Sequence, residues 1–64
     1  MMLIEFKNPL IIRKELEAAF NISPATLYRW IKEGRFPKQI RLGANMVRWE
    51  RKSIEAWMAE REAA

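Results

Sequence analysis

The chain has no cysteine, no histidine and no aspartate among its 64 residues. Without cysteine it has neither a disulfide nor a thiolate metal site, so the redox compartment stays open. Without histidine it also lacks a usual zinc ligand and the commonest general base. The glutamates form no paired acid site, Ser23 is better placed to cap a helix than to act as a nucleophile, and there is no Gly-rich phosphate loop. We therefore expect no enzymatic activity, no metal and no cofactor.

Long apolar runs are also missing. No run approaches the ~20 residues that span a bilayer, and the opening MMLIEFK carries a glutamate inside a run too short for a signal peptide. We therefore expect a soluble, cytoplasmic protein without a membrane partner. The length permits one domain at most. Half of the residues are apolar and three are tryptophan, which suffices for one small core.

Positive charge is concentrated in the middle of the chain. Residues 1–23, 24–52 and 53–64 carry net charges of 0, +6 and −2 within a total of +4. A concentrated positive field favours a polyanionic partner. The alternative is a basic surface that only keeps the protein soluble, and charge alone does not separate the two.

Two helices joined by a short turn are predicted first. Residues 12–20 carry an apolar stripe at helical spacing, formed by Ile12, Leu16, Ala19 and Phe20. Residues 24–33 carry a second stripe, formed by Leu27, Trp30 and Ile31. Asn21 suits the left-handed turn after the first helix, and Ser23 and Pro24 suit the cap and first turn of the second. Gly34 is a suitable residue to end it, with Pro37 beyond, so the pair forms a helix-turn-helix.

From residue 38 the apolar period changes to two, which predicts a hairpin with its loop at residues 43–45. One face of each strand is apolar, with Ile40 and Leu42 on the first and Val47 and Trp49 on the second, and Gln39, Arg41 and Arg48 opposite. A third helix, from about residue 51 to 60 or beyond, follows from the stripe of Ile54, Trp57 and Met58.

The predicted fold class is therefore a small α+β winged helix-turn-helix: a helix-turn-helix, a two-stranded antiparallel wing and a C-terminal helix. It occupies residues 10–64. Residues 1–9 form an N-terminal arm, in which the segment LIEF is either a short strand or loosely ordered.

The second helix keeps an open face once its core positions are removed, formed by Ala25, Tyr28, Arg29 and Lys32 with Thr26 at the margin. Pro24 and Ala25 are small, so the helix N-terminus with its unpaired N–H groups can approach a phosphate closely. Tyr28 offers an aromatic plane and a hydroxyl, and Arg29 can pair with guanine O6 and N7. A major groove about 12 Å wide accepts a helix presented in this way.

Each feature has a simpler interpretation. Arg29 and Lys32 can be solvated charges, and Tyr28 can pack against the first helix. The three tryptophans fit the core better than a base-stacking platform, because each is in phase with other apolar residues. The hairpin offers a second contact surface that is either an exposed polar face or a wing reaching the backbone or minor groove. Its candidate residues are Arg35, Lys38, Arg41, Asn45 and Arg48.

Residues 12–58 resemble the AlpA family of small phage and prophage regulators, and more broadly the MerR-like winged helix of excisionases. The motifs that carry the resemblance are KELEAAFNISPATLYRWIKEGRFPKQIRL, GANMVRW and SIEAWM. The resemblance implies a protein that binds double-stranded DNA on the nucleoid, with its recognition helix at residues 23–33 and its wing at residues 41–48. It implies a transcriptional regulator of an integrase gene, an excisionase (recombination directionality factor), or both, with an integrase as a further partner. The predicted DNA-binding residues are Ser23, Pro24, Ala25, Thr26, Tyr28, Arg29, Lys32, Arg35, Lys38, Arg41, Asn45 and Arg48.

Three positions depart from the family pattern. Ile12 stands where serine or threonine often caps the first helix, Asn21 where glycine is common, and Asn45 where the wing tip is commonly basic. We expect a monomer in solution that assembles cooperatively on DNA, since no long coiled coil follows the third helix. The alternative function is a protein-interaction module that binds an integrase or another partner through the acidic, apolar-striped helix from Ile54 onward.

Overall fold

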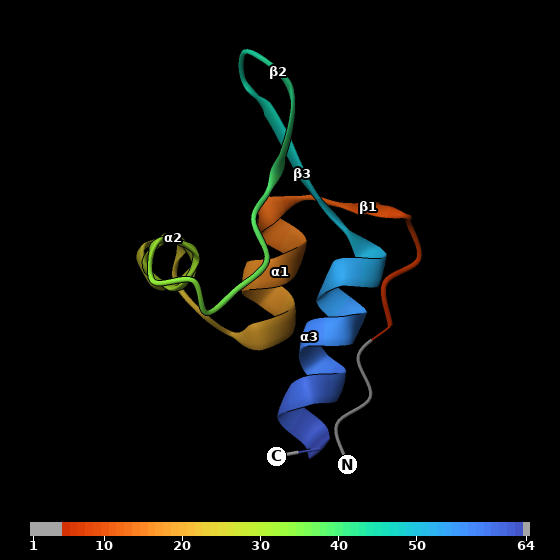
Figure 1. The fold of residues 1–64 in the computed structure, drawn as a ribbon. Helices are drawn as coiled ribbons and strands as arrows, with labels where there is room; N and C mark the ends of the chain where they lie inside the picture. The colour runs from red at the N-terminus through yellow and green to blue at the C-terminus, as the bar shows by residue number, and fades with distance from the viewer. Residues whose placement is uncertain (1–4, 64) are drawn as a thin grey trace.

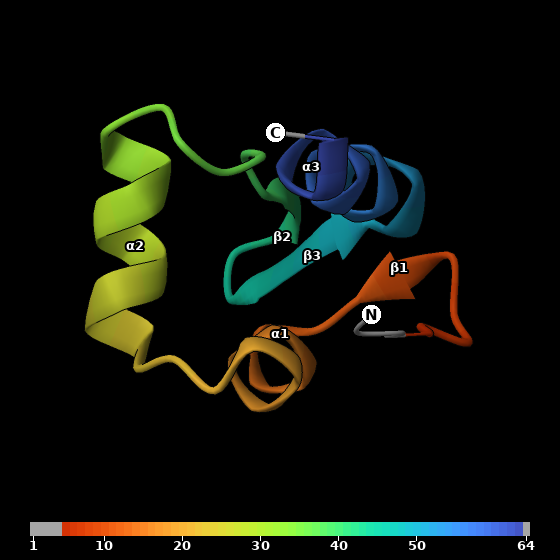
Figure 2. The same ribbon diagram turned by 90° about the horizontal axis from the view of Figure 1, so that it is seen from below.

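The computed structural model describes residues 5–63, the last of them by its backbone alone. Its elements are β1 (Leu10–Ile11), α1 (Arg13–Phe20), α2 (Pro24–Lys32), β2 (Ile40–Gly43), β3 (Met46–Glu50) and α3 (Arg51–Ala63). The hairpin of β2 and β3 projects from one end as a wing, and the three helices lie around its base (Figures 1 and 2). The predicted small α+β winged helix-turn-helix is confirmed. In the described part of the chain, no helix combines the length and apolar composition that a membrane crossing requires.

The sheet has one strand more than the sequence predicted. Its order is β1-β3-β2 with antiparallel pairing, and β1 pairs Leu10 with Glu50 and Ile11 with Trp49. The prediction of a two-stranded wing missed β1, and the segment at residues 3–6, predicted as either a short strand or loosely ordered, is described only in part. Residues 1–4 lie outside the described residues, and Glu5 and Phe6 belong to no strand. A two-residue strand is too short to show an alternation, so only its partner across the sheet reveals it.

α1 begins one residue later than predicted because Ile12 is its N-cap. Ile12 has extended backbone angles and accepts the N–H of Glu15 at 3.1 Å through its carbonyl. Its side chain is 38% exposed, so Ile12 does not belong to the core stripe as predicted. An N-cap residue stands outside the helical repeat, and its side chain therefore leaves the stripe. At the other end Asn21 adopts the predicted left-handed conformation, with φ of 54°.

α2 is capped at both ends by the residues that were predicted to cap it. The Ser23 side chain accepts the N–H of Thr26 at 3.2 Å, and Pro24 occupies the first helical position. The helix ends at Lys32 rather than Glu33, and Gly34 follows with φ of 75°. The N–H groups of Gly34 and Arg35 return to the carbonyls of Ile31 and Trp30 at 3.1 and 2.8 Å. These two hydrogen bonds together form a Schellman motif, which turns the chain toward the wing.

Replacing Gly34 with alanine is expected to lower the free energy of unfolding by about 1 to 2 kcal/mol. The cause is backbone conformation and not crowding, because a Cβ at this position would meet nothing within 4 Å. Urea denaturation followed by circular dichroism measures the loss. Gly43→Ala is the matched control, since Gly43 does not have a positive φ and its added Cβ would meet Met46 at an ordinary 3.8 Å. Equal losses in the two variants would contradict the backbone explanation.

The core lies where the sheet meets the helices. Its buried side chains are Phe6, Ile11, Leu16, Leu27, Phe36, Trp49 and Ile54. Leu16, Leu27 and Ile54 come from the three predicted helical stripes. Trp49 is fully buried as predicted, whereas Trp30 and Trp57 are half-buried and pack against the core from its edge. The core therefore fixes α2 through a single fully buried residue, Leu27.

Candidate nucleic-acid interface

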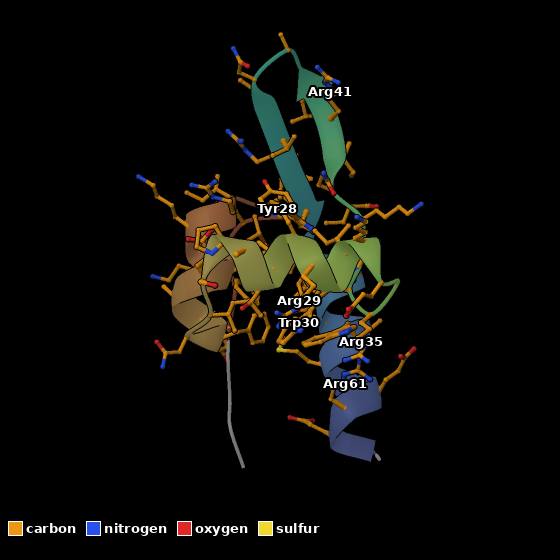
Figure 3. The ribbon with its side chains drawn as sticks, turned by 90° about the vertical axis from the view of Figure 1, so that its left-hand side faces the viewer. Tyr28, Arg29, Trp30, Arg35, Arg41 and Arg61 are labelled. Carbon is orange, nitrogen blue, oxygen red and sulfur yellow. The ribbon has the colours of Figure 1, made fainter. Side chains whose placement is uncertain are left out.

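α2 presents one side to the core and the other to solvent. Leu27 is buried, whereas Ala25, Tyr28, Arg29 and Lys32 are exposed, as the helical spacing predicted. Figure 3 looks onto α2 and shows Tyr28 on the side of the helix next to the wing and Arg29 on the opposite side. The Tyr28 side of α2 thus adjoins the base of the wing.

The N-terminus of α2 keeps little bulk in front of it. The Ser23 hydroxyl donates to Thr26 Oγ1 at 3.1 Å and accepts the Thr26 N–H, so the two polar side chains bind each other. Pro24 and Ala25 next to them are exposed and carry no polar side-chain group. The positive end of the helix dipole is therefore accessible to an anion, as the sequence predicted. The side chains of Ser23 and Thr26 form hydrogen bonds within the N-terminal cap of α2.

Three of the predicted site residues line one groove. It has a volume of about 540 Å³ and lies between the start of α1, the middle of α2 and the wing. Its lining residues are Ile12, Arg13, Lys14, Tyr28, Asn45, Val47 and Arg48. Tyr28, Asn45 and Arg48 therefore belong to one concave surface, although they are up to 20 positions apart in the sequence. Tyr28 is 39% exposed and lines the groove between α2 and the wing, so it is not part of the buried core.

Arg13 and Lys14, the first two residues of α1, also line this groove, although they were not among the predicted site residues. Arg13 Nε lies 2.9 Å from Glu17 Oε2, which neutralises part of its charge. Lys14 is exposed, with no described carboxylate within 4.0 Å. Two adjacent cations at a helix N-terminus interact unfavourably with the helix dipole. This unfavourable placement could have marked Arg13 and Lys14 as candidate binding residues in the sequence.

The wing turns out to carry its two arginines on different faces. Arg41 pairs with Val47 and Arg48 pairs with Ile40, and directly paired residues of antiparallel strands share a face. The prediction that Arg41 and Arg48 share one polar side of the hairpin is therefore wrong, because Arg41 shares a face with Val47. Alternation orders the faces within one strand, but the register between strands also depends on the bulge between Arg41 and Gly43. Arg41 instead braces the tip, because its Nε and Nη2 donate to the carbonyls of Gly43 and Ala44, each at 3.3 Å.

The segment that forms the wing and its approach carries a concentration of positive charge. Residues 34–49 contain four cations and no carboxylate. The ion pairs among the described residues are Arg13 with Glu17, Arg35 with Glu33 and Arg51 with Glu55. Arg29, Lys32 and Lys38 thus have no described carboxylate within 4.0 Å. An uncompensated positive surface of this kind matches a polyanion.

A model of the prophage CP4-57 regulatory protein (AlpA) family matches residues 10–62, from β1 to the last turns of α3. The chain belongs to the AlpA family. The resemblance inferred from the motifs is thereby confirmed, and the protein is a member of a family of prophage regulators. The AlpA-family chain is also similar to the uncharacterized protein ORF88 of Enterobacteria phage P4, with 43% identity over 42 residues. That alignment covers 66% of this chain and 48% of ORF88, so it spans about half of the relative's length.

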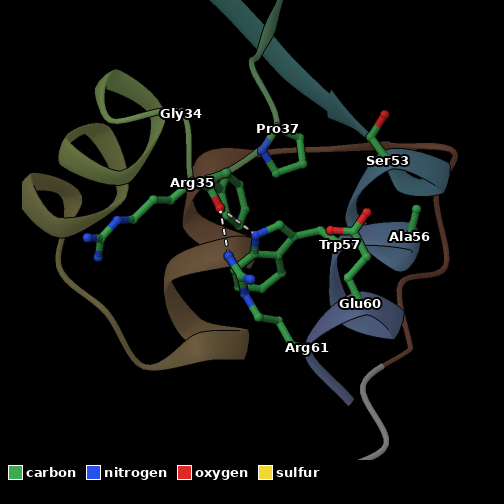
Figure 4. Close-up of a pocket in the computed structure, with 9 residues that line it drawn as sticks. Gly34, Arg35, Pro37, Ser53, Ala56, Trp57, Glu60 and Arg61 are labelled. Carbon is green, nitrogen blue, oxygen red and sulfur yellow. Dashed lines mark hydrogen bonds between the residues drawn. The ribbon is translucent and has the colours of Figure 1, made fainter. Parts of the chain in front are cut away.

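In this AlpA-family protein, Arg35 lies apart from the groove. It contributes to a separate cavity of about 650 Å³ lined by Trp30, Arg35, Trp57 and Arg61. The Arg35 carbonyl accepts the Trp57 indole N–H at 2.6 Å and the Arg61 guanidinium at 3.2 Å. Figure 4 shows the Arg35 side chain extending away from these two residues. The backbone of Arg35 therefore ties the segment after α2 to α3, while its side chain stays 68% exposed.

Lys38 occupies the connection between α2 and the wing. It is exposed, and it lies two residues before β2 begins. Lys32, at the end of α2, is also exposed, and neither lysine lines the groove.

Proposed function

We propose that this AlpA-family protein binds double-stranded DNA sequence-specifically, with α2 in the major groove and the wing against the adjoining backbone or minor groove. The observation that carries the proposal is the groove in which Lys14 of α1, Tyr28 of α2 and Arg48 of the wing meet. Three elements thus supply cations or hydrogen-bonding groups to one concave surface. A phosphate strand laid along that surface contacts all three elements at once, which fixes α2 relative to the duplex.

The side chains divide by role. Arg29 on the outer face of α2 reads base edges, since its fork of donors matches guanine O6 and N7. Tyr28, on the side of α2 next to the wing, hydrogen-bonds or stacks in the groove. Lys14, Lys38 and Arg48 contact phosphates, which positions the protein without selecting a sequence. The open N-terminus of α2, at Pro24 and Ala25, accepts a further phosphate.

Binding of this kind supports regulation of an integrase gene or control of excision, and we infer that the protein does one or both. We also propose a monomer in solution that assembles cooperatively on adjacent sites. α3 uses its apolar residues Ile54, Trp57 and Met58 against the core, which leaves no second stripe for a coiled coil. Analytical ultracentrifugation tests the monomer, and a stable dimer without DNA would overturn it.

A protein partner is the second candidate function. The cavity lined by Trp30, Trp57 and Arg61 favours it, because two half-buried indole rings lie 6.1 Å apart at the surface. An integrase is the partner that the family implies. A pull-down with purified integrase after nuclease treatment tests this candidate, and loss of all retained partner with nuclease would remove it.

The main experiment is fluorescence anisotropy of labelled duplex DNA over a series of salt concentrations. A fragment from beside the gene is compared with a scrambled fragment. Specific recognition predicts a preference of about 10³ or more and a steep fall of affinity with salt. Equal and weak binding to both fragments would contradict the proposal and favour the protein-partner candidate.

Replacing Lys14 with alanine is expected to weaken binding to both fragments alike. It should lower the slope of log affinity against log salt by about one, because one phosphate contact is lost. The same salt series measures it. Lys52→Ala is the matched control, since Lys52 is exposed on α3 and lies beside Pro9, Leu10 and Glu50, outside the groove. An equal change of slope in both variants would show that total charge, rather than the groove, determines the affinity.

A further inference from the structure

Two large apolar side chains are exposed at the tip of the wing. Leu42 is 50% exposed and Met46 is 48% exposed, more than any other large apolar residue in the described chain. Both belong to the end of the hairpin that projects from the helices (Figure 1). Single exposed apolar residues are ordinary. A pair at the extremity of a projecting element is not explained by the fold.

Both residues stand next to the turn of the hairpin. Gly43, which follows Leu42, pairs directly with Met46 across the hairpin. Neither Leu42 nor Met46 contributes to the core or lines the groove beside Tyr28. They therefore form an apolar tip with no partner in the described chain.

The tip is also braced. Arg41 holds the turn through its two hydrogen bonds to the carbonyls of Gly43 and Ala44. A bulge between Arg41 and Gly43 adds a local kink to the strand. A side chain on a turn that is held by hydrogen bonds keeps its orientation when it contacts another molecule, whereas a side chain on a flexible loop can move aside. The backbone at the tip thus suits insertion into another structure.

Charge identifies the partner. The wing and its approach carry Lys38, Arg41 and Arg48 and no carboxylate between residues 34 and 49. Phosphates complement such a rim. Leucine and methionine are among the side chains that proteins insert between base pairs from the minor groove. A nucleic-acid duplex is therefore the partner that fits both the apolar tip and its surroundings.

We infer that Leu42 and Met46 form an apolar wedge that enters the minor groove, partly unstacks one base step and kinks the DNA. This inference rests on the proposed DNA binding and adds an activity to it, deformation of the target.

A wedge also adds specificity at a position that α2 does not touch. Pyrimidine–purine steps such as TA and CA/TG unstack most easily, so the preferred site should hold one of them under the wing tip. Changing that step to a stiff A-tract is expected to weaken binding even though no base-edge contact is altered.

The test is the double variant Leu42→Ala/Met46→Ala on a duplex that carries dyes at both ends and 2-aminopurine at the candidate steps. The wild-type protein is expected to bend the duplex by about 20 to 90° and to raise 2-aminopurine fluorescence at one step. The variant should bind at most about 10-fold more weakly and leave the duplex nearly straight, with the fluorescence quenched. Leu10→Ala is the matched control, because Leu10 is a 38% exposed leucine in β1, and should bend DNA as the wild type does.

A second variant separates a wedge from simple charge contact. Leu42→Lys/Met46→Lys removes the apolar tip and adds two cations. A wedge predicts lost bending with a steeper salt dependence, whereas a tip that only touches phosphates keeps any bend and gains affinity. Circular dichroism confirms that each variant is folded, as expected for half-exposed positions.

The outcomes separate the two proposals. Specific binding by the wild type without a bend, or an unchanged bend in the double alanine variant, would overturn the wedge and leave DNA recognition intact. Absence of specific binding by the wild type in the same titration would instead remove the proposed function, and the wedge with it.

Discussion

Replacing Trp49 with alanine is expected to lower the free energy of unfolding by about 3 to 5 kcal/mol. Trp49 has no solvent exposure, stands in the central strand of the sheet opposite Ile11, and donates its indole N–H to the Pro37 carbonyl at 3.1 Å. A domain of this size buries only about 60% of its unfolded surface and has little stability in reserve. The variant should therefore be largely unfolded at 25 °C, as measured by urea denaturation and circular dichroism.

Two further tryptophan variants separate ring volume from hydrogen bonding. Trp49→Phe keeps most of the ring but leaves the Pro37 carbonyl without its donor, and should cost about 1 to 3 kcal/mol. Trp30→Ala, at a half-buried position on the edge of the core, should cost less than Trp49→Ala. A cooperative transition near the wild-type midpoint in Trp49→Ala would show that the sheet is not anchored as described.

Replacing Arg29 with alanine is expected to weaken binding to the preferred DNA site by about 1 to 3 kcal/mol, or about 5-fold to 150-fold, and to relax the preference at one base pair. Arg29 is exposed on α2, so the variant should keep the stability of the wild type. Anisotropy on a panel of duplexes, each changed at one base pair, measures both effects.

Arg29→Lys is the sharper comparison, because it keeps the charge and removes the fork of donors. It should lose the base preference while leaving the salt dependence near that of the wild type. Arg51→Ala, on α3 and paired with Glu55 at 3.9 Å, controls for loss of a cation elsewhere. An unchanged base preference in Arg29→Ala would count against a base-reading role for this residue.

The parts of the fold that could be predicted from the sequence depend on short-range signals. The cap at Ser23, the left-handed turns at Asn21 and Gly34, and the stripes through Leu16 and Leu27 each follow from a few neighbouring residues. Such signals stand in the sequence at a fixed spacing, and the structure confirms them. The boundaries shifted by only one residue at the start of α1 and at the end of α2.

The parts that could not be predicted depend on residues distant in sequence. β1 exists only through its pairing with β3 some 40 residues away, and Phe6 and Phe36 become buried only when loops close over the core. The face of Arg41 depends on the register of the hairpin, which alternation within one strand does not determine.

The candidate site divides in the same way. The exposed residues of α2 were predictable because one helix presents them all. The groove was not, because Lys14, Tyr28 and Arg48 meet through packing among three elements. The tie between the Arg35 backbone and α3 was not predictable either, because the Arg35 carbonyl meets Trp57 and Arg61 only through packing of residues more than 20 positions apart.

α2 places Leu27 in the interior and packs Trp30 and Ile31 against the core, which leaves its exposed positions free to vary with little effect on folding. Under the proposed DNA binding, a few substitutions on this one helix would change the preferred site while the sheet and the other helices keep their packing.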